Sequence, residues 1–211
     1  MNKQNNDNEN ELEIILASYS RARRDLLKKI GFKFKAVSTN VREKIFKDPI
    51  RSVLENSKLK ALKACEMGYR GIIIGVDTVV YIDDIILGKP RDIDEAFKYL
   101  KMLSGREHKV YSGITIYNTH SGKIVQDYEE TIVHFRELSD EEIKWYITTG
   151  EPLEKAGGYS IQGYASIFID YIKGCYYNVV GLPLVKLFKL LSEVGINPYR
   201  HIEIQHKIPS I

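Results

Sequence analysis

Short apolar runs along the chain alternate with segments in which apolar residues recur every three or four positions. The first pattern predicts buried strands and the second predicts amphipathic helices. The predicted helices cover residues 21–30, 48–67, 92–103, 139–149 and 182–194. The predicted strands cover residues 13–18, 34–37, 71–76, 79–82, 85–87, 109–118, 123–135 and 166–172. Interleaved helices and strands predict an α/β fold with a mixed sheet.

The two ends of the chain differ from this pattern. Residues 1–11 are rich in Asn and acidic residues and contain no apolar run, which predicts a disordered polar tail. Residues 12–196 show no repeat or composition break, so we expect a single domain, followed by a C-terminal tail over 197–211. No apolar run is long enough to span a bilayer, and the N-terminus lacks the apolar core of a signal peptide. We therefore expect a soluble, cytoplasmic protein without a membrane partner.

Composition and charge exclude several classes of protein. The two cysteines, Cys65 and Cys175, have no partner spacing, which argues against a disulfide framework or a zinc site. The formal net charge of +3 is too small to indicate a protein that coats nucleic acid. The 14 tyrosines are scattered and do not interleave with a basic stripe. Stable nucleic-acid binding is therefore not expected.

The first predicted strand is followed by a turn of small hydroxyl residues that includes Ser18, and then by a helix with Arg21, Arg23 and Arg24 in its first turns. The N-terminus of a helix carries a positive dipole end and normally favours acidic side chains. Arginines at this position fit a bound polyphosphate, because guanidinium groups pair with phosphate oxygens. The alternative is a solvated basic helix face.

Asp77 directly follows the apolar run of residues 71–76. This order predicts a carboxylate at the carboxyl end of a buried strand, where ligands bind in open α/β sheets. Such a carboxylate can hold a metal ion or accept a proton from water. The alternative is an aspartate that caps the following turn.

Two further segments combine glycines with polar side chains. Lys89 stands in a Gly-Lys-Pro turn, and residues 151–163 contain Glu151, Lys155, Gln162 and three glycines. Glycines let the backbone approach a ligand closely, and a glutamine amide can bind the edge of a base. Neither a Walker-type phosphate loop nor a dinucleotide-binding fingerprint occurs.

Taken in order, these segments resemble the Maf family of nucleotide pyrophosphatases from about residue 14 to residue 195. The matching stretches are Leu16-Ala17-Ser18 to Arg23, Gly75-Val76-Asp77-Thr78, Gly88-Lys89-Pro90, Leu103-Ser104-Gly105, Glu151-Pro152 through Lys155-Ala156-Gly157 to Ile161-Gln162-Gly163, and Val180-Gly181-Leu182-Pro183. The resemblance implies a two-lobed Maf/inosine-triphosphatase-like fold with a central cleft. It also implies a catalytic domain that forms a homodimer and uses a divalent cation, Mg²⁺ or Mn²⁺.

The resemblance also assigns roles to individual residues. It implies that Asp77 accepts the proton of the attacking water and, with Glu43, holds the metal ion. It places a set of side chains around the substrate: Ser18, Arg23, Lys60, Thr78, Lys89, Lys155 and Gln162, with Glu151 also lining the cleft.

Substrate choice follows from three positions in the resemblance. Thr78 and Gln162 are typical of the members that hydrolyse dTTP and UTP to the monophosphate and pyrophosphate. Ala22 departs from those members, which carry Arg there, whereas members that prefer 7-methyl-GTP carry an aromatic residue. We therefore expect a dTTP and UTP pyrophosphatase that cleans nucleotide pools. A pyrophosphatase for modified nucleotides and a non-catalytic nucleotide sensor in cell division are the alternatives, and the intact Asp77, Lys89 and Lys155 favour an enzyme.

Overall fold

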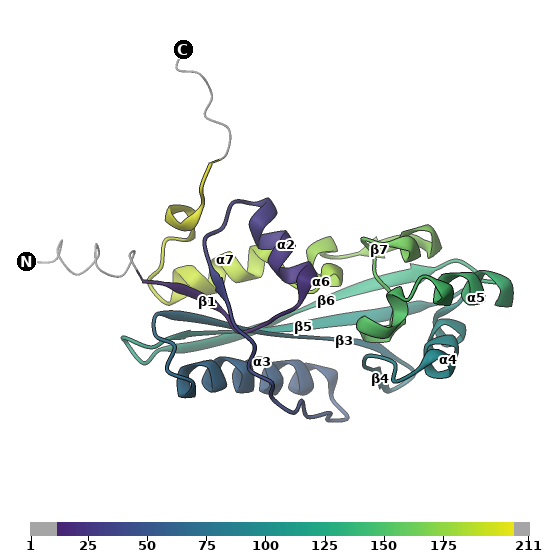
Figure 1. Ribbon diagram of the computed structural model, residues 1–211, viewed down its shortest axis with the longest axis horizontal. Coiled ribbons are helices and arrows are strands. Elements are labelled where there is room, and N and C mark those ends of the chain that lie inside the picture. The colour runs from purple at the N-terminus through teal and green to yellow at the C-terminus, as the bar shows by residue number, and fades with distance from the viewer. Residues whose placement is uncertain (1–11, 205–211) are drawn as a thin grey trace, which may run out of the picture.

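The computed structural model describes residues 12–204 (Figure 1). The predicted tail over residues 1–11 and the last part of the predicted C-terminal tail, 205–211, lie outside the described residues. The helices are α2 (Arg21–Lys29), α3 (Pro49–Glu66), α4 (Ile93–Leu103), α5 (Asp140–Thr148), α6 (Tyr176–Val180) and α7 (Leu184–Glu193). The strands are β1 (Ile14–Leu16), β2 (Lys35–Ala36), β3 (Ile72–Ile82), β4 (Ile85–Leu87), β5 (Glu107–Asn118), β6 (Ile124–Phe135) and β7 (Ile169–Lys173). Four 3₁₀ helices complete the fold: η1 (Glu151–Glu154), η2 (Ala156–Gly158), η3 (Tyr164–Phe168) and η4 (Pro198–His201).

The strands form one seven-stranded mixed sheet in the order β2-β1-β3-β5-β6-β7, with β4 also paired to β3. Strand β1 runs parallel to β2 and β3, and the remaining pairs are antiparallel. The predicted α/β fold with a mixed sheet is confirmed.

One edge of strand β3 has a single partner strand, and the other edge has two. One edge pairs with β5 from Ile72 to Tyr81. The other edge pairs with β1 over residues 72–74 and with β4 over residues 80–82. Residues 75–79 have no strand beside them on that edge, and Asp77 lies at the centre of this interval.

This position of Asp77 differs from the prediction. The sequence predicts a strand that ends before Asp77, but β3 continues through it to Ile82. The β-branched residues after Asp77 favour an extended backbone, so one polar residue does not end the strand. The predicted hairpin is present, with Asp83 and Asp84 both at positive φ in a two-residue turn between β3 and β4.

Two smaller differences lie in the second half of the chain. The predicted strand over 166–172 begins only at Ile169, because η3 occupies the residues before it. The short helix α6 was not predicted, since its five residues are too few to show helical periodicity.

The two largest apolar clusters lie toward the two ends of the sheet. One cluster joins β1, α2 and α7 to the first half of β3. A second cluster joins α4 and α5 to the second half of β3 and to β5. Figure 1 shows α2 and α7 together at one end of the sheet, α4 and α5 at the other end, and α3 on the opposite face. The two clusters form the cores of two lobes that share one sheet.

Two glycines bring helix α3 unusually close to the sheet. A Cβ atom on Gly75 would lie 2.0 Å from the carbonyl oxygen of Ser57, and one on Gly113 would lie 2.5 Å from that of Val53. Any other residue would therefore push α3 away from β3 and β5. The close packing places the polar side chains of α3 directly against Asp77.

The segment after α7 returns to the first lobe. Within it, η4 buries His201, and Ile202 forms an antiparallel bridge with Phe32. The first residues of the predicted C-terminal tail thus pack against the domain. No helix within residues 12–204 is long and apolar enough to cross a membrane.

Candidate active site

A cleft of about 850 Å³ opens between the two lobes, beside the unpaired interval of β3. Ten residues were predicted from the sequence as catalytic, binding, specificity or metal positions. All of them line this cleft: Ser18, Ala22, Arg23, Glu43, Lys60, Asp77, Thr78, Lys89, Lys155 and Gln162. They come from both lobes and from segments separated by more than half of the chain. The fold therefore brings together residues whose proximity the sequence alone does not show.

Asp77 is almost completely buried in the wall of the cleft, with 4% of its surface exposed. Its Oδ1 accepts a hydrogen bond from Lys60 Nζ at 2.6 Å, and its Oδ2 accepts one from Asn56 Nδ2 at 3.0 Å. Burial raises the pKa of the Asp77 carboxyl, and the negative charge of Glu43 adds to this effect, whereas Lys60 opposes it. The carboxylate is thus held in one orientation by two donors of α3.

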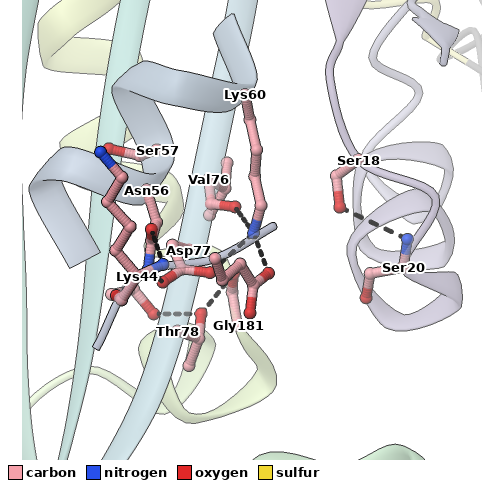
Figure 2. A network of polar contacts seen from close by, with 12 residues as sticks. Ser18, Ser20, Lys44, Asn56, Ser57, Lys60, Val76, Asp77, Thr78 and Gly181 are labelled. Atoms are coloured by element: carbon pink, nitrogen blue, oxygen red, sulfur yellow. Dashed lines mark hydrogen bonds and ion pairs between the residues drawn. The ribbon is translucent and has the colours of Figure 1, made fainter. Parts of the chain in front are cut away.

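Lys60 joins two carboxylates. Its Nζ lies 2.6 Å from Asp77 Oδ1 and 2.6 Å from Glu43 Oε1, and it also donates to the carbonyl oxygen of Val76 at 3.2 Å. Figure 2 shows the Lys60 side chain extending from α3 to Val76 and Asp77. Burial acts to raise the pKa of Glu43, but the positive charges around it, that of Lys60 first, lower it overall. Glu43 therefore carries its negative charge at neutral pH beside Asp77.

Arg23 is fixed in the wall of the cleft. Its Nε donates to the carbonyl oxygen of Gly181 at 2.8 Å, and one terminal nitrogen donates to Ser18 Oγ at 2.9 Å and to Val76 O at 3.2 Å. The other terminal nitrogen donates to Thr78 Oγ1 at 2.9 Å. These bonds use most of the N–H groups of the guanidinium, so Arg23 supplies a positive charge at a fixed place.

Three residues of the site received no role from the sequence, although Gly181 lies in one of the stretches that resemble the Maf family. Asn56 holds Asp77, Ser112 contacts the hydroxyl of Thr78 at 2.8 Å, and Gly181 accepts the hydrogen bond from Arg23. A signal for Asn56 was present, because Ser52, Asn56 and Lys60 stand four residues apart and are all buried on α3. A polar stripe of this spacing faces one side of a helix.

Lys89, Lys155 and Gln162 line the cleft from the turn at residues 88–90 and the loop at residues 151–163. Their two segments are joined where the N–H of Gly157 donates to the carbonyl oxygen of Gly88 at 2.9 Å. Gly157 has a φ of 68°, and a Cβ there would lie 2.7 Å from Val80 Cγ2. Within residues 12–204, neither Lys89 nor Lys155 forms a side-chain hydrogen bond or ion pair. Both ammonium groups are free to bind an anion.

Glu151 does not line the cleft, contrary to the prediction. Its Oε1 accepts a hydrogen bond from Tyr146 Oη at 2.7 Å, and its Oε2 accepts one from the N–H of Tyr164 at 3.1 Å. A Cβ on Gly163 would lie 1.8 Å from this carboxylate, so glycine is needed there. Glu151 anchors the loop that carries Lys155 and Gln162. In the sequence alone, a carboxylate that anchors a loop cannot be distinguished from one that binds a ligand.

Glu43 and Asp77 are the carboxylates that could hold a cation. Within the described part of the chain, no group of three or more His, Cys, Asp and Glu side chains is placed to bind a metal. Mg²⁺ is usually held by one or two carboxylates together with substrate phosphates and water. Two carboxylates around one ammonium group fit a cation that binds with its substrate and do not form a complete protein cage.

Comparison with known proteins shows the family to which this chain belongs. The model of the Maf family, described as "Maf-like protein", matches residues 13–194. A relative from Thermoanaerobacter sp. (strain X514), named dTTP/UTP pyrophosphatase, is 49% identical over 183 residues, covering 86% of this chain and 96% of the relative. A protein of the same name from Clostridium tetani is 48% identical over 191 residues, covering 88% of this chain and 100% of the relative.

The structure of the Staphylococcus aureus Ham1 protein aligns with a TM-score of 0.47 and 12% identity over 86% of this chain and 99% of that chain. The family assignment rests on the sequence matches, which span both lobes and every residue of the cleft described above. The chain belongs to the Maf family.

Proposed function

We propose that this protein is a nucleoside triphosphate pyrophosphatase that hydrolyses dTTP and UTP to the monophosphate and pyrophosphate. The observation that carries the proposal is the buried Asp77 carboxylate, held by Lys60 and Asn56 in the wall of a cleft lined by cationic side chains. The names of the relatives support the same activity.

The charge and size of the cleft suit a nucleotide. Its volume falls in the usual range of small-molecule sites, about 300–1,000 Å³. Arg23 and Lys60 are fixed at the side of β3, whereas Lys89 and Lys155 have free ammonium groups on the facing side. A triphosphate between the two sides would be neutralised from both lobes. Catalysis of phosphoryl transfer depends mainly on this kind of positioning and charge stabilisation.

Asp77 is the proposed proton acceptor. In the reaction, the water oxygen bonds to the α-phosphorus, the bond from this phosphorus to the bridging oxygen breaks, and the water proton passes to Asp77 Oδ. Burial raises the pKa of Asp77, and this direction suits the role, because a stronger base accepts the proton more readily. Lys60 and Asn56 keep the carboxylate oriented.

A divalent cation, Mg²⁺ or Mn²⁺, would be held by Glu43 and Asp77 together with phosphate oxygens. Its chemistry is to neutralise the charge that develops on the leaving pyrophosphate. Lys60, which contacts both carboxylates, then has the further role of holding them at one site.

Base choice is assigned to the three specificity positions, with different roles. The Thr78 hydroxyl already contacts Arg23 and Ser112, so Thr78 acts by positioning Arg23. Gln162 forms no side-chain hydrogen bond within residues 12–204, and its amide is the group that would bind the base edge. Ala22 lines the cleft without a polar group, and we expect it to widen specificity relative to an arginine.

The proposal is tested by pyrophosphate release from dTTP, UTP, CTP, ATP, GTP, ITP and 7-methyl-GTP, with Mg²⁺, with Mn²⁺ and with a chelator. We expect metal-dependent release that is fastest with dTTP and UTP, and a narrower preference in Ala22→Arg. Faster release from 7-methyl-GTP would support the modified-nucleotide alternative. A folded protein that binds nucleotides without turnover would overturn the enzyme and support the sensor.

Two further expectations belong to this proposal. The resemblance implies a homodimer, which sedimentation analysis of the purified chain would test. The proposed substrates are nucleotides of the cytoplasm, so localisation there would be checked with a tagged copy in cells.

A further inference from the structure

Tyr19 presents an open aromatic ring at the rim of the cleft. It lines the cleft, and 62% of its surface is exposed. Within residues 12–204, its hydroxyl forms no hydrogen bond and no other aromatic ring packs against it. Aromatic side chains supply much of the contact area in ligand sites, so an exposed ring that lines the cleft is available to a ligand.

One face of this ring is supported by a cation from α2. The guanidinium carbon of Arg24 lies 4.5 Å from the centre of the Tyr19 ring. Arg24 forms no side-chain hydrogen bond or ion pair in the described part of the chain, and its Nε is buried without a partner. Stacking on Tyr19 is thus the interaction that this side chain makes. It covers one face of the ring, and within residues 12–204 no aromatic ring or further cation stacks on the other face.

No other side chain of residues 18–22 carries an aromatic ring. Ser18 Oγ is used by Arg23, Ala22 has no polar or aromatic group, and Arg21 pairs with Asp25 at 3.5 Å on the exposed side of α2. Tyr19 is therefore the residue of this turn with a free flat surface.

From this geometry we infer that Tyr19 is a stacking platform for the nucleobase of the substrate. The inference rests on the proposed function and adds a binding residue to the same cleft. Stacking on an aromatic ring is available to every base, because each base has a π face. Tyr19 therefore supplies affinity for the nucleoside part, and the choice among bases is left to the specificity positions Ala22, Thr78 and Gln162.

The test is equilibrium binding of two probes by calorimetry. One is the α,β-imido analogue of UTP, which is not hydrolysed, and the other is inorganic tripolyphosphate, which has no base. We expect Tyr19→Ala to weaken binding of the analogue by about tenfold, which is within the range measured for base–aromatic stacking. The affinity for tripolyphosphate should not change. Tyr19→Phe should bind both probes like the wild type.

Tyr199→Ala is the matched control, because Tyr199 is 72% exposed and lies outside the cleft. It should bind both probes like the wild type. Equal binding of the analogue by Tyr19→Ala and the wild type would overturn the inference, and so would an equal loss of both probes. The assay does not depend on turnover. A wild type that binds the analogue but releases no pyrophosphate would refute the proposed activity and leave the result for Tyr19 standing.

A second measurement uses fluorescence. The chain has a single tryptophan, Trp145, so Tyr19→Trp combined with Trp145→Phe places the only indole at the rim of the cleft. Stacking predicts that the analogue quenches its emission and that tripolyphosphate does not. Unchanged emission with the analogue bound would place the base away from Tyr19 and overturn the inference.

Discussion

Lys60 Nζ and Asp77 Oδ1 lie 2.6 Å apart across the contact between α3 and β3, and both side chains are nearly buried. A buried ion pair costs solvation when it forms, but removing one partner leaves an uncompensated charge in the interior. The pair therefore links two properties of this site. It orients the carboxylate that we assign as the proton acceptor, and it makes the position of α3 part of the site.

The first prediction concerns the proton acceptor. Asp77→Asn keeps the shape of the side chain and the contact with Asn56 but removes the base. Positioned proton transfer contributes about a hundred- to ten-thousandfold, so we expect a loss of pyrophosphate release of at least that order. Circular dichroism should show a folded protein. Turnover of dTTP or UTP at the wild-type rate would show that another group accepts the proton.

The second prediction concerns the buried pair. Lys60→Met should lower the free energy of unfolding by about 3–5 kcal/mol, because Asp77 remains buried without its cation. Adding Asp77→Asn to Lys60→Met removes that charge and should restore part of the lost stability. Urea unfolding of the two single variants and the double variant forms a complete cycle.

If the effects of Lys60→Met and Asp77→Asn on unfolding simply add, the two side chains do not interact in the folded protein. Lys186 offers a comparison, since it forms ion pairs with Asp127 and Glu129 outside the cleft and is more exposed. Lys186→Met should cost less stability than Lys60→Met, because ion pairs nearer to the solvent contribute less.

The third prediction concerns the distance between α3 and the sheet. Gly75→Ala introduces a methyl group where Ser57 O now lies, so α3 has to shift outward. Overpacking of this kind typically costs about 1–3 kcal/mol. Because α3 carries Asn56 and Lys60, we expect the rate of pyrophosphate release to fall along with the melting temperature.

Gly122→Ala is the control for Gly75→Ala. A Cβ on Gly122 meets no atom within 4 Å, although its φ of 74° makes the substitution strained. It should reduce stability and leave the rate of the folded enzyme unchanged. Full activity in a folded Gly75→Ala protein would mean that the site tolerates movement of α3.

Much of the fold could be read from the chain because its pattern is regular. The long helix α3, the hairpin at Asp83 and the strands β5 and β6 follow from periodicity and turn residues. The end of β3 could not be read in this way. A buried carboxylate inside a strand has the same local sequence as one that follows a strand, and only the partners on α3 distinguish the two cases.

The same limit applies to the candidate site, because the local sequence does not show which contacts a polar side chain makes. Motif spacing found the residues on short loops, such as Lys89 and Lys155, where glycine and proline mark the turns. It misplaced Glu151, because a carboxylate that anchors a loop and one that binds a ligand are equally polar in sequence. Asn56 was missed since its role depends on the contact between α3 and β3, which the two glycines make possible.

The last prediction concerns acid stability and uses a group outside the cleft chemistry. His108 is buried on β5, and its Nε2 lies 2.8 Å from Tyr159 Oη. Burial lowers the pKa of His108 from 6.5 to about 3, and the nearby His134 adds to the shift. A depressed pKa means that the unfolded chain binds this proton more readily than the folded one. The stability contributed by neutral His108 is therefore fully present above pH 6.5 and is lost as the pH falls toward 3.

His108→Gln keeps a polar group for Tyr159 but removes this titration. We expect the variant to be less stable than the wild type at neutral pH, because it loses ring contacts with Phe135. Between pH 6.5 and 3, its free energy of unfolding should fall less steeply, since the proton uptake that favours the unfolded wild type is absent. Urea unfolding across this range measures the slope. Equal slopes in the two proteins would show that His108 has the same pKa in the folded and the unfolded state.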